Sequence, residues 1–251
     1  SVIKHTNLKD NQLLVIDDGS PDPAVGPVLD SFAGTPGLTI MRSPRNLGYT
    51  KTINLGIGQA AGRDVILLNS DTVVTPRWLE GLRATAYSRP NVGTVTAMGD
   101  NAGAFSFPLH NQKCDKPDHL THEEYALMMV QAAVDCAAPE VPTGSGFCMY
   151  IRRAMMDACG TFDEEGFPRG YGEENDFCMR AMKAGWVNLI SPWAFVFHIR
   201  TASFKGEKDK LVKEGVDVVM KRYPDYARLV KAAFSGPDMM ALREATARAV
   251  I

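Results

Sequence analysis

Asp64-Val-Ile-Leu-Leu-Asn-Ser-Asp-Thr72 is the stretch of this sequence that decides the fold. Its four consecutive apolar residues predict a short strand that is buried on both faces. Pro76 marks the start of a helix just beyond it. Ligands of open α/β sheets bind at the carboxyl ends of the strands, so we expect Asn69 and Asp71 to lie at a ligand site.

Strands and helices alternate upstream of this strand. The predicted elements are a strand at 12–17, a helix at 24–32, a strand at 38–42 and a helix at 50–61. Such alternation at short intervals predicts βαβ units and a parallel sheet. Asp17 and Asp18, at the end of the first strand, would then share one rim with Asp71. An Asp-Gly turn with no further role is the alternative for the first two.

The second half of the chain contains further strands and helices. The predicted strands are at 91–98, 147–151, 186–190 and 194–198, and the predicted helices are at 121–134, 152–159, 207–223 and on either side of 235–237. Thr121 and Glu124 have the spacing of a capping box. We expect a domain over 1–205 and a C-terminal helical extension over 206–251. The amphipathic helices of this extension either pack on the back of the domain or contact another copy, a partner or a membrane surface.

One predicted helix, between Gly172 and Gly185, has three carboxylates in its first turn. Glu173, Glu174 and Asp176 suit a general base or a metal ligand there, although capping is the alternative. Neighbouring side chains on a helix point ~100° apart, so Glu173 and Glu174 are not expected to face one cleft. Glu173 and Asp176, three residues apart, share a face.

The composition excludes some functional classes. A formal charge of −2 over 251 residues gives no electrostatic case for a nucleic-acid partner. The five cysteines are an odd number at irregular spacings, without a zinc pattern, and predict reduced thiols in a cytoplasmic protein. No apolar run approaches the ~20 residues that span a bilayer, so membrane contact would be peripheral, at the inner face.

Seven pieces of the sequence, in this order, resemble the family 2 glycosyltransferases of the GT-A fold. They are Val15-Ile-Asp-Asp-Gly-Ser20, Asn46-Leu-Gly48, Leu67-Leu-Asn-Ser-Asp-Thr72, Gly144-Ser-Gly146, Phe162-Asp-Glu164, Glu173-Glu-Asn-Asp176 and His198. The form of the third piece looks most like bacterial rhamnosyl- and galactofuranosyl-type transferases of surface polysaccharide synthesis. The resemblance implies an α/β fold, Rossmann-like, with a mostly parallel central sheet, helices on both faces and added C-terminal helices.

The same resemblance implies roles for individual residues. Asp71 and His198 match metal ligands, and Glu174 matches the base that deprotonates the acceptor, with Glu173 and Asp176 as alternatives. The residues matching a nucleotide-sugar site are Asp17, Asp18, Asn46, Gly48, Asn69, Ser70, Gly144 and Ser145.

The implied activity is inverting transfer of a sugar from a nucleotide-diphosphate donor to a hydroxyl of a saccharide or lipid-linked acceptor, assisted by Mn²⁺ or Mg²⁺. A non-catalytic binding module for nucleotide sugars or carbohydrates and a sugar nucleotidyltransferase are the alternatives.

The sequence departs from the family pattern at three places. Asn69 replaces the first Asp of the family's metal motif, Glu174 stands where Asp is usual, and eleven residues precede the first strand at 12–17. We therefore expect the family's first strand-helix unit to be absent from this chain.

Overall fold

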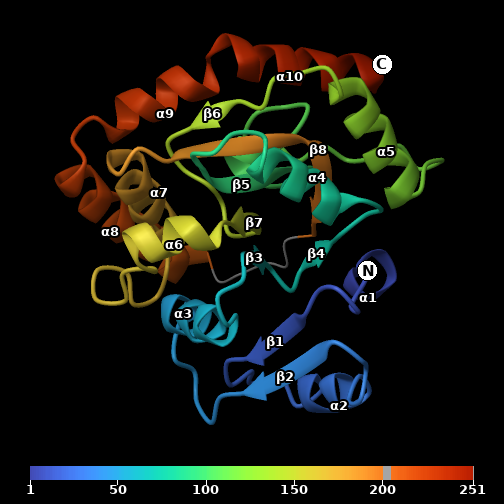
Figure 1. Ribbon diagram of the computed structural model, residues 1–251, viewed down its shortest axis with the longest axis vertical. Helices are drawn as coiled ribbons and strands as arrows, with labels where there is room; N and C mark the ends of the chain where they lie inside the picture. Colours follow the sequence, from blue (N-terminus) through green and yellow to red (C-terminus); the bar gives the residue numbers. More distant parts are fainter. Residues whose placement is uncertain (200–204, 251) are drawn as a thin grey trace.

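A small N-terminal unit forms one end of the molecule. The computed structural model describes residues 1–199 and 205–250. Within these ranges it describes every side chain except those of residues 205–209. After α1 (Val2–His5), strands β1 (Leu13–Asp17) and β2 (Leu38–Arg42) pair in parallel, with α2 (Val25–Asp30) between them in sequence. Helix α3 (Tyr49–Gln59) then leads back to the body of the molecule (Figure 1). This strand-helix-strand unit is the one that the alternating pattern predicts.

The larger sheet lies at the centre of the molecule (Figure 1). Its strands follow the order β3-β7-β5-β8-β4, and β6 pairs with β8. The bounds are β3 (Val65–Leu68), β4 (Thr72–Val73), β5 (Val92–Gly99), β6 (Glu140–Val141), β7 (Cys148–Ile151) and β8 (Val187–His198). Within this sheet β5 and β8 run parallel, and the other described pairs are antiparallel.

The α/β class is confirmed, but the sheet is mixed where we expected mostly parallel pairing. Apolar runs show where strands lie but not in which direction they run. The sequence therefore predicted parallel pairing only from the first half of the chain, where strands and helices alternate. Strand β7 runs antiparallel to both of its neighbours, β3 and β5. Among the described strands, β1 does not pair with β3. Asp17 and Asp71 therefore belong to different sheets, since Asp17 ends β1 and Asp71 directly precedes β4.

The two strands expected at 186–190 and 194–198 are one strand, β8. Its pairing with β5 is irregular, because Ser191 pairs with Ala97 while Phe195 pairs with the next residue, Met98. The residues between them, including Pro192, form a bulge. A bulge accommodates a residue that has no backbone N–H to donate, so Pro192 bends the strand without ending it.

Helices surround the central sheet. They are α4 (Trp78–Ala86), η1 (Gly103–Phe105), α5 (His122–Ala133), α6 (Arg153–Cys159), α7 (Glu173–Lys183), α8 (Lys205–Arg222), α9 (Tyr226–Phe234) and α10 (Pro237–Ala249). Helices α9 and α10 run along the side of the molecule opposite β1 and β2 (Figure 1). The capping box predicted for Thr121 and Glu124 is present at the start of α5. Gly172 and Gly185 flank α7 as the sequence predicts.

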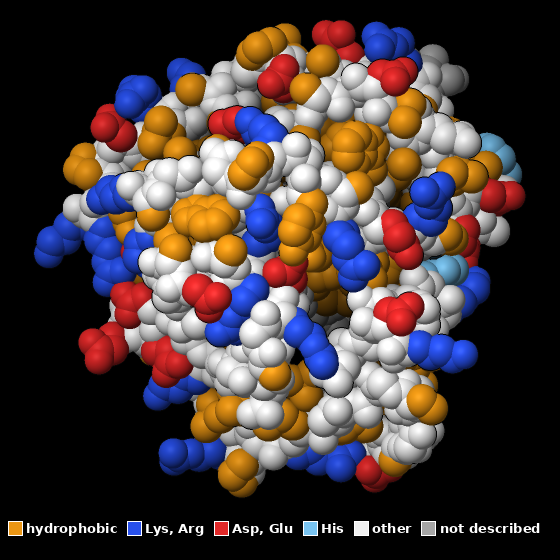
Figure 2. Space-filling view, viewed as in Figure 1, with side chains coloured by type: hydrophobic (Ala, Val, Ile, Leu, Met, Phe, Trp, Pro, Cys, Tyr) orange, Lys and Arg blue, Asp and Glu red, His pale blue; other side chains and the backbone are white. Residues whose placement is uncertain are grey.

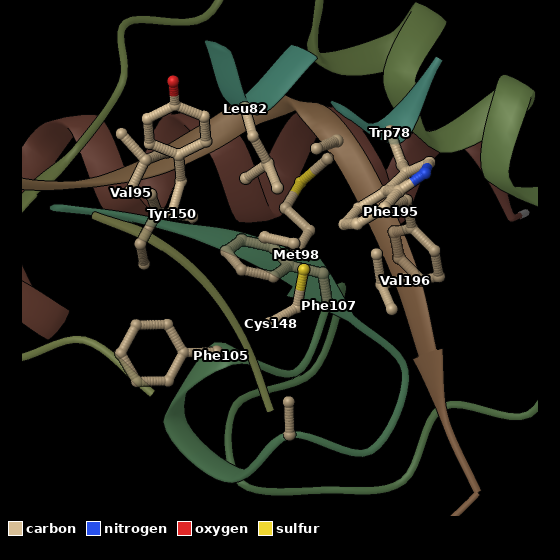
Figure 3. Packing of buried hydrophobic residues seen from close by; sticks show 14 of the residues in the cluster. Trp78, Leu82, Val95, Met98, Phe105, Phe107, Cys148, Tyr150, Phe195 and Val196 are labelled. Carbon is tan, nitrogen blue, oxygen red and sulfur yellow. The ribbon is translucent and has the colours of Figure 1, made fainter. Parts of the chain in front are cut away.

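The largest core is built between the central sheet, α4, α5 and α10. Leu82, Met98 and Phe195 lie at its centre, fully buried or nearly so (Figure 3). Met239 and Leu242 of α10 belong to the same cluster. The C-terminal helices therefore pack on the domain, which is the first of the two interpretations of their amphipathic pattern. The boundary predicted at 205/206 adjoins residues 200–204, outside the described part, and stays a prediction.

All five cysteines are free thiols, and Cys148 and Cys178 are fully buried. Burial raises the pKa of the Cys178 thiol to about 12, so it is protonated at neutral pH. In the part of the chain that the structure describes, no helix combines the length and the hydrophobicity that crossing a bilayer requires.

Candidate active site

Asn69, Asp71 and His198 come together at the ends of β3, β4 and β8. Strand β4 begins at Thr72, which pairs with His198, so the residue before β4 meets the last residue of β8. Asp71 Oδ1 lies 3.2 Å from His198 Nε2, and Asn69 Nδ2 lies 3.4 Å from the same nitrogen. The His198 side chain is buried and that of Asp71 is 27% exposed. The Asp71 carboxylate is thus more accessible than the His198 ring.

The Asp71–His198 pair has the spacing of two ligands on one cation. Two ligand atoms at ~2.1 Å from a metal and ~90° apart lie about 3 Å from each other. A carboxylate oxygen with an imidazole nitrogen suits Mn²⁺. No three His, Cys, Asp or Glu side chains form a metal-binding group among the described residues. A cation held here by Asp71 and His198 would need further ligands from a substrate.

Phe147 connects this group to the loop Gly144-Ser-Gly146. The Asn69 N–H donates to the Phe147 carbonyl oxygen at 3.0 Å. The Phe147 ring stacks on the His198 ring, with centroids 5.4 Å apart. The preceding Gly146 N–H donates to Glu174 Oε1 at 3.0 Å. Two adjacent residues therefore join the Asp71–His198 pair to the first turn of α7.

Asp100 accepts a hydrogen bond from the backbone of His198, and the sequence analysis did not single out this residue. It follows β5 directly, and its Oδ1 accepts the backbone N–H of His198 at 2.7 Å. The residue is 8% exposed, and burial raises the pKa of its carboxyl group. Its place at the carboxyl end of a parallel strand was the signal that could have identified it.

Glu173 and Glu174 meet at the start of α7, which corrects the expectation that they point apart. Their carboxyl groups lie within interaction range of each other, and Glu173 Oε2 accepts the Gly172 N–H at 2.9 Å. Glu173 is the first residue of the helix and its side chain folds back over the terminus, so the regular ~100° spacing does not separate the two carboxyls. Glu173 is 2% exposed. Burial and the neighbouring Glu174 raise the pKa of Glu173 to about 9.

Asp176 faces the opposite direction and joins α7 to α8. Its carboxylate accepts from Arg180 Nε at 2.9 Å, Arg222 Nη1 at 2.8 Å and the Tyr223 hydroxyl at 2.9 Å. The residue is 1% exposed. Of the three first-turn carboxylates, the geometry gives Asp176 a structural role and leaves Glu174 as the partly exposed one.

Tyr49 lies beside the two glutamates and was not among the residues singled out in the sequence. A Cβ added at Gly146 would lie 2.5 Å from the Tyr49 hydroxyl and 2.7 Å from Glu174 Oε1. A Cβ added at Gly170 would lie 3.3 Å from Tyr49 Cδ1 and 3.5 Å from Glu173 Oε1. Burial of the hydroxyl and the charges of Glu174 and Glu173 raise the pKa of Tyr49 well above its usual value.

Asp18 fixes the loop that carries Tyr49. Its Oδ1 accepts the Leu47 N–H at 2.8 Å and its Oδ2 accepts the Gly48 N–H at 3.0 Å. Asn46 Oδ1 accepts the same Gly48 N–H at 3.0 Å. The end of β1 is therefore connected to the site through the start of α3, and no shared sheet edge is involved.

The remaining residues predicted for the nucleotide-sugar site make local contacts. Asp17 Oδ1 accepts the Ser20 N–H at 2.9 Å, and this hydrogen bond lowers the pKa of Asp17. The Gly144 N–H donates to Cys178 Sγ at 3.1 Å and the Ser145 N–H to Thr96 Oγ1 at 3.2 Å. Ser70 is exposed between Asn69 and Asp71.

The surface around this region shows no large area of one charge. Figure 2 shows Lys and Arg side chains interspersed with Asp and Glu on the face it draws. That face is hollowed near its centre, in the part of the view where Figure 1 shows β3 and β4. The mixed charges of this face create no field that would favour a polyanion.

Comparisons with known proteins identify relatives of this chain. An N-acetylglucosaminyltransferase of Sinorhizobium fredii is 28% identical over 201 residues, which is 77% of this chain and 46% of that protein. An N-acetylglucosaminyl-diphospho-decaprenol L-rhamnosyltransferase of Mycobacterium tuberculosis is 25% identical over 214 residues, 76% of this chain and 67% of that protein. The chain spans 25% to 46% of the length of three curated relatives, among them the N-acetylglucosaminyltransferase of S. fredii.

The fold is also that of a solved glycosyltransferase. The crystal structure of GalNAc-T7 with UDP, GalNAc and Mn²⁺ superimposes with a TM-score of 0.66 at 19% identity, covering 98% of this chain and 50% of that one. The family model described as glycosyl transferase family 2 matches residues 1–160, which is more than half of the chain. The chain therefore belongs to glycosyl transferase family 2.

Proposed function

We propose that this chain is an inverting glycosyltransferase that moves a sugar from a nucleotide-diphosphate donor to a hydroxyl of a saccharide or lipid-linked acceptor. The observation that carries the proposal is the connection of Glu174 to the Asp71–His198 pair through Gly146 and Phe147. A base for the acceptor and a binding site for the leaving group are thus held by one short loop.

Asp71 and His198 would hold a divalent cation, Mn²⁺ or Mg²⁺, together with the donor's phosphates. Bound there, the cation would neutralise the negative charge that develops on the diphosphate as the anomeric bond breaks. The structure of GalNAc-T7 contains UDP and Mn²⁺, which supports this assignment. Asn69, whose amide contacts His198, supplies a neutral donor where the family has a second carboxylate.

Glu174 would take the proton of the acceptor hydroxyl. A positioned general base contributes typically 10²- to 10⁴-fold to a rate. The acceptor oxygen attacks the anomeric carbon opposite the diphosphate, and the bond to the diphosphate oxygen breaks with its electron pair. A single displacement of this kind inverts the anomeric configuration and needs no second carboxylate as nucleophile.

The acceptor class is part of the proposal. The relative from M. tuberculosis carries in its name a lipid-linked N-acetylglucosamine acceptor and a rhamnosyl group. This name supports a saccharide or lipid-linked acceptor for this chain. With the cytoplasmic placement expected from the sequence, we propose that the chain acts in surface polysaccharide synthesis at the inner face of a membrane.

The test is donor turnover by the parent chain, Glu174→Gln and Asp71→Ala, with Asp157→Asn as a control that removes an exposed carboxylate of α6. A panel of UDP-, dTDP- and GDP-sugars with Mn²⁺ is offered with saccharide and lipid-linked acceptors. We expect E174Q to lower kcat by 10²-fold or more and leave donor binding intact, and D71A to weaken Mn²⁺-dependent donor binding. D157N should match the parent, and proton NMR of the product should show an inverted anomeric centre.

Two results would contradict the proposal. Retention of the anomeric configuration would exclude the single displacement. Donor binding without turnover by the parent across the panel would favour a non-catalytic nucleotide-sugar module, the alternative that Asn69 motivates.

A further inference from the structure

The two carboxyl groups at the start of α7 lie within interaction range of each other, and two carboxyl groups share a hydrogen bond only when one of them carries a proton. Glu173 is the member that holds it, because its carboxyl is 2% exposed and lies beside a second acidic group. A buried carboxylate without a cation is costly, and the described contacts of Glu173 include none. Its remaining oxygen accepts the Gly172 N–H, a bond that the protonated acid can also accept.

We propose that Glu173 is a positioning residue that stays protonated at neutral pH, donates a hydrogen bond to Glu174 and holds that carboxylate toward the acceptor. This inference rests on the proposed function and deepens it, because it assigns different roles to two adjacent glutamates that the sequence left as alternative bases.

The position of Glu174 is then fixed from both sides. Gly146 donates its N–H to Glu174 Oε1, and Glu173 donates its carboxyl O–H to the same carboxylate. Tyr49 borders the same space: its hydroxyl and Glu174 Oε1 lie 2.5 and 2.7 Å from the Cβ position at Gly146, and its Cδ1 and Glu173 Oε1 lie 3.3 and 3.5 Å from that at Gly170. Two donors leave a carboxylate with free lone pairs for one further proton, that of the acceptor hydroxyl.

One proton moves in the proposed displacement step. The acceptor O–H bond breaks, its proton goes to Glu174, and the oxygen electron pair forms the new bond to the anomeric carbon. The diphosphate leaves with the electron pair of the broken bond. Glu173 keeps its own proton throughout, and Glu174 returns the acquired proton to solvent before the next turnover.

The arrangement makes activity sensitive to alkaline pH. The titratable groups facing Glu173 are Glu174 on its own helix and Tyr49 on α3, and both disfavour its ionised form. Asp176, on the same helix, is neutralised by Arg180 and Arg222. When Glu173 ionises, near pH 9, it turns from a donor into a like charge beside Glu174 and the base loses its orientation.

The experiment compares the full chain with Glu173→Ala and Glu173→Gln. Gln is the uncharged isostere of a protonated Glu and retains an N–H donor. We expect E173A to lower kcat at least 10-fold at pH 7.5 with KM for the donor little changed, and E173Q to restore kcat to within about threefold of the parent. Because Gln does not titrate, E173Q should also lose the fall in kcat that the parent shows toward pH 9 and above.

A second measurement is independent of turnover. Infrared difference spectra of the parent minus E173Q at pH 7.5 should show the carbonyl stretch of a protonated carboxylic acid. Absence of this band would overturn the proposal even if no donor is ever turned over. If the parent is active and E173Q is as impaired as E174Q, Glu173 is itself the base and the assignment is wrong. A band in an inactive parent would preserve the proton on Glu173 and reject the proposed function alone.

Discussion

Gly146 is the residue at which the two sides of the site meet. Its N–H reaches Glu174, its successor Phe147 contacts His198, and the space beside its Cα is filled by the Tyr49 hydroxyl. A glycine at such a position allows the backbone to approach a ligand closely. In the structure the close neighbours are two side chains of the protein, and one of them comes from a helix almost a hundred residues earlier, which no local pattern encodes.

Gly146→Ala should therefore impair catalysis without unfolding the chain. The added Cβ would lie 2.5 Å from the Tyr49 hydroxyl and 2.7 Å from Glu174 Oε1, so Glu174 has to shift. Displacement of a base by an ångström can cost up to about 10²-fold, and we expect kcat to fall at least 10-fold. Steady-state kinetics with a thermal melt of the same variant measures both effects.

Gly58→Ala is the matched control, since a Cβ at Gly58 meets nothing within 4 Å. It should keep the parent's kcat. Adding Tyr49→Phe to G146A removes the hydroxyl and should recover part of the loss. No recovery in the double variant would show that Tyr49 and Gly146 do not compete for the same space.

At the scale of the element, the carboxylates in the first turn of helix α7 face two sides and have different roles. Glu173 and Glu174 belong to the site, and Asp176 anchors α8 through Arg222 and Tyr223. The sequence predicted the helix, its flanking glycines and its acidic first turn, because these depend on residues within a few positions of each other. It could not distinguish the three carboxylates, since their partners come from α3, α8 and the loop before β7.

Arg222→Ala should destabilise the fold. Arg222 donates to Asp163 at 2.7 Å and to the buried Asp176 at 2.8 Å, so its removal leaves a buried carboxylate with Arg180 and Tyr223 alone. We expect the free energy of unfolding to fall by about 2 kcal/mol in urea denaturation. Arg228→Ala, which breaks an exposed ion pair with Asp225, should change it by less than about 0.5 kcal/mol. Equal effects of the two variants would contradict the role given to Asp176.

On the scale of the whole molecule, the C-terminal helices belong to the same folded body as the site. Leu242 is fully buried in the main core, and Arg243 donates to the carbonyl oxygens of Ala104 and Ser106 at 2.8 and 2.7 Å. The amphipathic pattern of these helices predicted an apolar face but not its partner. Only the fold shows that α10 packs against α5 and the loop after β5.

Leu242→Ala should therefore lower the free energy of unfolding by about 2 to 5 kcal/mol, because it leaves a cavity in the main core. The neighbour Met240, on the same helix, is 52% exposed, and Met240→Ala should stay within about 0.5 kcal/mol of the parent. Urea titrations of the three proteins decide this. A fully stable L242A would mean that α10 is a detachable surface helix and that its amphipathic face serves a partner.

The hydrogen bond from Gly146 and the ring contact of Phe147 have a consequence for how the reaction distance is maintained. In the proposed reaction, two consecutive residues set the spacing between Glu174 and the Asp71–His198 pair, since Gly146 contacts Glu174 and Phe147 contacts His198. A change in the backbone of this short loop would therefore alter the separation of the proposed base from the proposed cation site.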